Sequence, residues 1–174
     1  MKNITIRVNK NEVEKIGNKY RYGKNAAGMN KGDMIEAYLR KFLNPTDEKW
    51  YVKNSDAYNV GSDIEASGMK ISVKSGEFSL TEKIWSPVYT EQAKQELIEQ
   101  YAQTVPSNTV AYGYMTETET EYIIEIVMVT MEIFIKFLKI SAVMTIIDTK
   151  TKRYKIKVKR TPKSVIKTFI ELGA

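Results

Sequence analysis

The sequence predicts a single mixed α/β domain in which helices flank a central sheet. Its length of 174 residues suits one domain with a core of its own. Hydrophobic residues make up 43% of the chain and charged residues 28%, which is near the average for soluble globular domains. Apolar residues at helical spacing alternate along the chain with β-branched and aromatic runs, a pattern typical of α/β folds.

The N-terminal part of the chain predicts a strand, a basic arm and a helix. Residues 4–8, ITIRV, alternate apolar and polar side chains as a short strand does. Residues 19–31 are rich in Gly, Asn, Lys and Tyr without periodicity, and we expect a basic loop or arm there. From Asn30, apolar residues recur at helical spacing until Asn44-Pro45, a pair that ends a helix.

The middle of the chain predicts three short strands and a second helix. Trp50 to Val52 is a candidate strand. Residues 60–76, VGSDIEASGMKISVKSG, are expected to form two short strands around a Ser67-Gly68 turn. Residues 90–101 have a helix-forming composition, with Thr90 as the expected N-cap.

The remaining elements form a second strand-rich half. The expected elements are buried strands at 109–115 and 122–130, an amphipathic helix at 131–139, a hairpin from strands at 142–148 and 153–160, and a last helix after Pro162. We therefore divide the single domain, 1–174, into an N-terminal strand and basic arm (1–29), a core (30–139), and a basic hairpin with a terminal helix (140–174).

Cysteine and histidine are both absent, which excludes whole classes of chemistry. Without them the chain has no disulfide, no thiolate nucleophile, no Ser-His-Asp triad and no zinc site that uses these ligands. Catalysis would have to use carboxylates, lysine, hydroxyls and hard metal ions such as magnesium. The lack of cysteine also favours a reducing cytoplasm.

The net charge of +6 favours polyanionic partners, because cationic side chains bind phosphates and release counterions. Many small basic proteins carry such a charge without binding nucleic acid, so charge alone does not decide this. The apolar stretch 122–144 is interrupted by charged residues, and the N-terminus lacks the apolar core of a signal peptide. We therefore expect no membrane association and a cytoplasmic location.

The hairpin around Ser67-Gly68 carries the strongest candidate site. In a two-residue turn, Asp63 would lie opposite Ser72 and Glu65 opposite Lys70. Because side chains alternate across a strand, Ile64, Ile71 and Val73 would share one face. The opposite, polar face would hold Asp63, Glu65, Lys70, Ser72 and Lys74. An ordinary half-exposed strand pair with a Glu65–Lys70 ion pair is the alternative interpretation.

Such a polar face has the chemistry of phosphodiester hydrolysis. That reaction uses carboxylates to hold one or two divalent ions, and a lysine to orient the attacking water or to neutralise developing charge. Asp63 is the main candidate metal ligand, and Lys74 is the candidate for the lysine.

These residues resemble the PD-(D/E)XK, or restriction-endonuclease-like, nuclease superfamily. The resemblance rests on Glu36 in the helix KGDMIEAYLRKFL, Asp63 in GSDIEASG and Ser72-Val73-Lys74 in MKISVKSG, and it covers residues 30–139. It implies a restriction-endonuclease-like domain with a mixed central sheet, followed here by the extra hairpin and helix. It also implies a magnesium- or manganese-dependent nuclease, with DNA favoured over RNA on family habit alone.

The chain departs from the family pattern at Ser72, which stands where the family usually has a carboxylate. Some restriction enzymes of this superfamily carry the same Ser-Val-Lys variant and take a glutamate from the next helix. By that resemblance Glu91 or Glu96 would complete the metal site, and Glu65 is a nearer candidate. Ser72 would then orient a metal-bound water. The same departure also fits an inactive site on an intact fold.

Two basic segments are candidate nucleic-acid contacts. In the last hairpin, Lys155, Lys157 and Lys159 share one face and Arg160 ends the strand, as a phosphate-tracking ribbon would. A charged edge strand that resists aggregation is the alternative. In the arm, KYRYGK at 19–24 interleaves tyrosines with Arg21 and Lys24, which suits stacking on unpaired bases, although an ordinary loop is favoured.

The sequence therefore predicts a metal-dependent nuclease of phage or mobile-element type. The competing hypothesis is a catalytically inactive nuclease-fold binder, such as a phage inhibitor of CRISPR or restriction enzymes, and a structural protein is a third class. A nucleic-acid-processing protein complex is a further candidate partner. The sequence leaves the oligomeric state open.

Overall fold

The computed structural model describes residues 1–17, 31–51, 62–84, 91–148, 150 and 153–174. It has a mixed α/β architecture, as predicted. The chain forms two compact units. The first unit contains Met1–Ser75 and Pro106–Met128, and the second contains Gly76–Val105 and Val129–Ala174.

The first unit is built on a five-stranded mixed sheet of order β1-β6-β5-β3-β2. Its elements are β1 (Lys2–Asn9), α1 (Lys10–Gly17), α2 (Lys31–Leu43), β2 (Ile64–Ala66), β3 (Met69–Ser75), β5 (Thr109–Glu117) and most of β6 (Glu121–Thr130). β3 runs parallel to β5, whereas β2 is antiparallel to β3 and β1 to β6. The sheet is therefore mixed, as expected.

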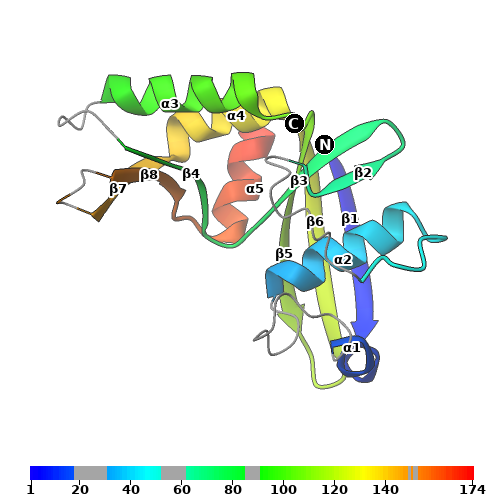
Figure 1. The fold of residues 1–174 in the computed structure, drawn as a ribbon. Coiled ribbons are helices and arrows are strands. Elements are labelled where there is room, and N and C mark those ends of the chain that lie inside the picture. The colour runs from blue at the N-terminus through cyan, green and yellow to red at the C-terminus, as the bar shows by residue number, and fades with distance from the viewer. Residues whose placement is uncertain (18–30, 52–61, 85–90, 149, 151–152) are drawn as a thin grey trace. The chain divides into compact units, whose positions relative to one another are not determined.

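Helix α2 supplies the apolar layer over one face of this sheet (Figure 1). Ile35 and Leu39 are fully buried and belong to one cluster with Ile71 of β3 and Ile126 of β6. The helix approaches β5 so closely that a Cβ on Gly113 would lie 2.5 Å from Ile35 Cγ2. Glycine at this position lets the helix and the sheet pack in contact.

The β2–β3 hairpin has the predicted register. Ile64 pairs with Ile71, Glu65 with Lys70 and Ala66 with Met69 around the two-residue turn. Ser67 and Gly68 both have positive φ, at 51° and 76°, as the central residues of a type I′ turn do. This turn matches the twist of the strands, so the local sequence fixes the register.

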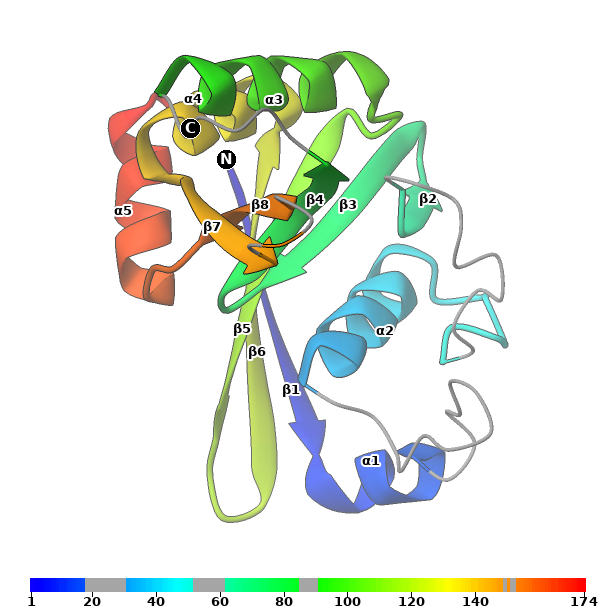
Figure 2. The same cartoon turned by 60° about the vertical axis from the view of Figure 1, so that its left-hand side comes forward.

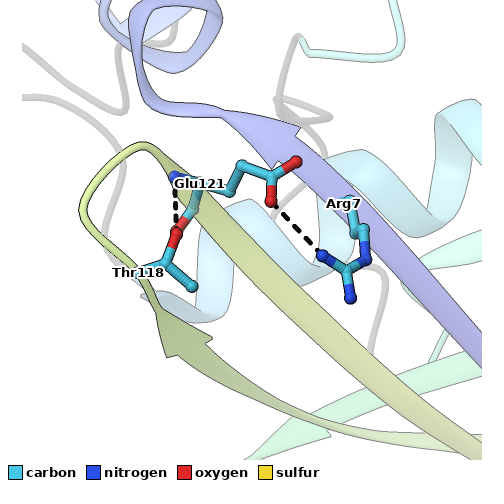
Figure 3. Close-up of polar contacts among 3 residues, drawn as sticks. All are labelled: Arg7, Thr118 and Glu121. Atoms are coloured by element: carbon cyan, nitrogen blue, oxygen red, sulfur yellow. Dashed lines mark hydrogen bonds and ion pairs between the residues drawn. The ribbon is translucent and has the colours of Figure 1, made fainter.

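The β5–β6 connection closes with a short polar turn (Figure 3). The backbone N–H of Glu121 donates to the Thr118 hydroxyl at 3.0 Å, and the backbone N–H of Thr118 donates to the Glu121 carbonyl at 2.8 Å. On the neighbouring strand, Arg7 of β1 pairs with the Glu121 carboxylate at 3.3 Å. These contacts join the end of the hairpin to β1.

The second unit contains a small sheet and three helices, in which α3 and α4 lie side by side (Figure 2). Its elements are β4 (Phe78–Ile84), α3 (Glu91–Thr104), α4 (Met131–Ser141), β7 (Val143–Asp148), β8 (Arg153–Val158) and α5 (Pro162–Glu171). Phe134, Phe137 and Phe169 form a row of contacting rings in its core. Thr130 and Thr161 cap α4 and α5 with their hydroxyls.

Several element predictions are confirmed, and others are wrong or incomplete. The strand predicted at Trp50 to Val52 is wrong at Trp50 and Tyr51, which lie in a turn where Trp50 packs against Tyr38 with ring centroids 5.0 Å apart, and Val52 lies outside the described residues. Helix α1 and strand β4 were not predicted. A cap at Asn9, whose side chain accepts from the Asn11 N–H at 2.8 Å, is a local signal for α1. The described residues contain no helix with the length and apolarity needed to cross a bilayer.

Candidate functional site

Asp63 occupies a fixed position at the start of the β2–β3 hairpin. Its backbone N–H donates to the Ile71 carbonyl at 2.8 Å, and its Oδ2 accepts from the backbone N–H of Val73 at 2.7 Å. The carboxylate is therefore held against β3, where the strand runs beyond its pairing with β2. A carboxylate has about four acceptor positions, so this bond leaves capacity for a cation.

Helix α2 lies beside the hairpin (Figure 2) and carries Glu36 and Arg40. Arg40 donates from Nη2 to the Asp63 carbonyl at 3.2 Å. The same nitrogen lies 3.9 Å from Oε1 of Glu36, and both side chains are largely covered, with 15% and 17% exposure. Glu36 is thus a partly buried, ion-paired residue close to Asp63 rather than a solvated surface charge.

Lys74 is the third member of this cluster. The pKa of Lys74 is lowered because burial disfavours its charged form, while the Asp63 and Glu36 carboxylates act on it in the opposite direction. Both acids are therefore within electrostatic range of the ammonium group. Glu36, Asp63 and Lys74, which are among the residues on which the resemblance rests, thus interact electrostatically, and we call them with Arg40 the acid–lysine cluster.

Ser72 is buried, whereas we expected it on a solvent-facing polar surface. Its side chain is only 1% exposed, and its hydroxyl has no hydrogen-bond partner among the described residues. Ile71 on the opposite face is fully buried as well, so β3 is covered on both sides at this point. The alternation of side chains was predicted correctly, but the burial of the polar face was not, because it depends on contacts far away in the sequence.

The other candidate carboxylates lie in different surroundings. Glu65 is exposed and stands opposite Lys70 in the ladder, as an ordinary cross-strand pair does. On α3, in the second unit, Glu91 bonds to Lys94 at 2.7 Å and to Gln95 at 3.1 Å, and Glu96 accepts from Gln92 at 3.1 Å. The Lys94 and Gln95 contacts lower the pKa of Glu91. The described contacts of Glu91 and Glu96 are thus made within their own helix.

The basic ribbon is a central strand rather than an edge. β8 lies between β4 and β7, so the alternative of a charged edge strand is wrong. Ile156 and Val158 are buried on one face, and Lys159 is exposed. Lys157 pairs with Glu77 at 3.2 Å, and Arg160 donates to the Thr168 hydroxyl at 3.4 Å. Arg21 and Lys24 lie outside the described residues.

Within the described part of the chain, no three Asp or Glu side chains gather into a group that could hold a metal ion. No family model, curated protein or solved structure matches the chain. The site must therefore be judged on its own chemistry. A magnesium ion commonly uses one or two carboxylates and takes its other ligands from water and substrate phosphates, and Asp63 and Glu36 fit that role.

Arg40 is the site residue that sequence analysis missed. It stands one helical turn after Glu36, a spacing at which the two side chains share a face. That spacing was visible in the sequence, but the approach of Arg40 to the Asp63 carbonyl depends on the packing of α2 against the hairpin.

Proposed function

We propose that the protein is a metal-dependent nuclease that hydrolyses phosphodiester bonds through the acid–lysine cluster. The observation that carries this proposal is that Arg40 links the two acids: its Nη2 bonds to the Asp63 carbonyl at 3.2 Å and lies 3.9 Å from Glu36 Oε1. Lys74 is within electrostatic range of both carboxylates. Structural ion pairs also gather acids with lysines, but a partly buried lysine whose pKa is lowered although two acids lie near it is typical of functional sites.

Each residue has a role in this proposal. Asp63 and Glu36 hold Mg²⁺ or Mn²⁺, which supplies Lewis-acid stabilisation of the phosphate when bound. Lys74 orients the attacking water or balances charge on the phosphate oxygens. Arg40 holds the Asp63 segment against α2 through the Asp63 carbonyl. The burial of Ser72 does not suit the role of orienting a water in open solvent.

The connectivity also supports the proposal. Helix α2, strands β2 and β3, and then helix α3 and strand β5 follow one another in the order on which the resemblance to PD-(D/E)XK nucleases rests, with β4 inserted before α3. β5 returns parallel to β3, as a crossover through a helix requires. We propose DNA as the favoured substrate and the cytoplasm as the location, on the family habit and the lack of cysteine respectively.

The test is a cleavage assay on plasmid, single-stranded DNA and RNA, with Mg²⁺, Mn²⁺ or EDTA. Asp63→Asn and Lys74→Met are the test variants. Lys70→Met is the matched control for the lysine, because Lys70 lies on the same strand and is exposed. We expect metal-dependent cleavage that both test variants lose and Lys70→Met retains. Equal activity of Asp63→Asn and the wild type would overturn the proposal.

A second candidate function is binding of nucleic acid without cleavage, on an inactive nuclease fold. The serine at position 72, where a carboxylate would be expected, and its burial favour this alternative. It predicts that the protein shifts labelled nucleic acid in a gel-shift assay and cleaves none with Mg²⁺ or Mn²⁺. Asp63→Asn should then leave binding unchanged. The cleavage assay therefore separates the two functions directly.

A further inference from the structure

The small sheet of the second unit has one face that packs on the core. Phe78 of β4, Met144 of β7, and Ile156 and Val158 of β8 share this face and are buried. The Phe78 ring stacks on Phe134 of α4, with the ring centroids 5.9 Å apart. Because side chains alternate along a strand, the residues between these apolar side chains point to the opposite face.

A lysine lies at the centre of that opposite face. Lys157 of β8 is flanked in the ladder by Ser79 of β4 and Val143 of β7, and both of these neighbours are exposed. Lys155 lies two residues earlier on the same side of β8, and Lys159, which is exposed, follows the end of the strand. This face of the sheet is therefore open to solvent, and we call its three lysines the cationic row.

The charge around the cationic row has one sign. Every charged residue between positions 150 and 167 is a lysine or an arginine. Lys155 and Lys159 form no ion pair with any residue that the structure describes, and Lys157 pairs with Glu77 at 3.2 Å. The Glu77 side chain is 57% exposed, so this pair contributes little stability and can exchange with another anion. Positive charge that is so little compensated fits a polyanionic partner.

The composition of the open face favours a phosphate backbone over unpaired bases. Lysine is a compact point charge that contacts phosphate oxygens without reading a sequence. Proteins that hold single strands usually add aromatic side chains on which the bases stack. The described side chains of the open face belong to lysine, serine, threonine and valine, which offer no stacking surface. A double strand, whose bases already stack on each other, suits this face better.

We propose that the cationic row is a sequence-independent docking surface for the phosphate backbone of double-stranded DNA, in a different unit from the acid–lysine cluster. The choice of nucleic acid among polyanions rests on the proposed nuclease function. Each lysine of the row neutralises one phosphate, and Glu77 competes with phosphate for Lys157. A single strand carries the same phosphodiester groups, and the experiment separates these two sources.

The test is fluorescence anisotropy on the full chain in EDTA, which prevents metal-dependent cleavage. The probes are two labelled DNA duplexes of unrelated sequence and one of their single strands. Titrations at salt concentrations from about 50 to about 200 mM give the salt dependence of the affinity. We expect the two duplexes to bind equally well and the single strand to bind more weakly.

Variants of the row locate the binding. Lys157→Gln and Lys159→Gln should each lower the slope of log affinity against log salt concentration by about 0.9 on duplex DNA, because each removes one phosphate contact. Lys136→Gln is the matched control. It removes the same charge from the same unit, but Lys136 lies on α4 and pairs with Glu132 at 2.7 Å. This control should leave the slope unchanged.

Removal of the competing carboxylate should act in the opposite direction. Glu77→Gln frees Lys157, so we expect it to tighten duplex binding by about twofold to fivefold, the range of an exposed ion pair. In a Lys157→Gln background the same change should have no such effect. Glu132→Gln, which frees Lys136 on α4, is the control for the loss of a negative charge.

The proposal is overturned if Lys157→Gln and Lys159→Gln keep the salt slope of the wild type, or if the single strand binds as tightly as the duplexes. Binding to phosphatidylserine vesicles in a sedimentation assay, without binding to the duplexes, would identify a membrane partner instead. Thermal melts of the variants check that the fold is retained. Because the titrations contain no metal, their failure leaves the nuclease proposal standing, and a failed cleavage assay leaves the binding result intact.

Discussion

The Oδ2 atom of Asp63 accepts a 2.7 Å hydrogen bond from the backbone N–H of Val73, the residue immediately before Lys74. This bond fixes the aspartate against the strand that carries the lysine. It also satisfies a backbone N–H of β3 at a point where β2 has ended. One contact therefore both completes the hairpin and positions the carboxylate.

We predict that Asp63→Asn lowers the free energy of unfolding by about 1 kcal/mol, because the amide oxygen still accepts from Val73 but the bond loses its charge assistance. Cleavage should fall about a hundredfold or more. Urea unfolding and the plasmid assay measure the two effects. Asp47→Asn is the control for stability, since Asp47 also accepts one backbone bond, from Lys49 at 2.9 Å. A large loss of stability with unchanged cleavage would assign Asp63 a structural role only.

We predict that Lys74→Met stabilises the protein at pH 7, because burial disfavours the charge of Lys74 more than the Asp63 and Glu36 carboxylates favour it. The pKa of Lys74 is lowered in the folded protein by burial, so the unfolded chain binds this proton more tightly than the folded chain does. Stability of the wild type should therefore rise with pH between the lowered pKa and the ordinary value of 10.5. The gain in stability from Lys74→Met should therefore become smaller as the pH rises through this range.

Thermal melts of wild type, Lys74→Met and the exposed-site control Lys70→Met over this pH range provide the measurement. The control should show a constant difference from the wild type. The prediction would be contradicted if the Tm difference between Lys74→Met and the wild type also stayed constant over this pH range.

We predict that Gly113→Ala destabilises the first unit by about 1–3 kcal/mol, because the new Cβ would lie 2.5 Å from Ile35 Cγ2 and would push α2 away from β5. Truncation of the neighbour should relieve the clash. Gly113→Ala should therefore lower the free energy of unfolding by less in an Ile35→Ala background. A double-mutant cycle by chemical denaturation measures this coupling. Strictly additive costs would show that the two positions do not compete for the same space.

We predict that Ser67→Asn raises the free energy of unfolding by about 0.5 kcal/mol, since asparagine tolerates the positive φ of 51° better than serine does. Gly68→Ala should lower it by about 1 kcal/mol, because φ at this residue is 76°. Both positions are exposed, so the effects report the backbone alone. Denaturant midpoints are the measurement, and a destabilising Ser67→Asn would argue against a type I′ turn.

Local sequence determined the elements whose signals lie within a few residues. The Ser67-Gly68 turn fixed the register of β2 and β3, because the turn type and the alternation of side chains leave one pairing that buries Ile64 and Ile71. The helical spacing before Asn44-Pro45 likewise predicted α2. Asp63 and Lys74 could be predicted to lie near each other for the same reason, since they belong to one hairpin.

Tertiary structure decided the surroundings of these residues. Contacts between distant segments brought Arg40 to the Asp63 carbonyl, paired β3 in parallel with β5, buried Ser72, and lowered the pKa of Lys74. The physical reason is that hydrophobic burial has no direction and no fixed sequence separation. A pattern of residues therefore predicts which side chains share a face, whereas the charge state and partners of those side chains depend on what the fold packs against that face.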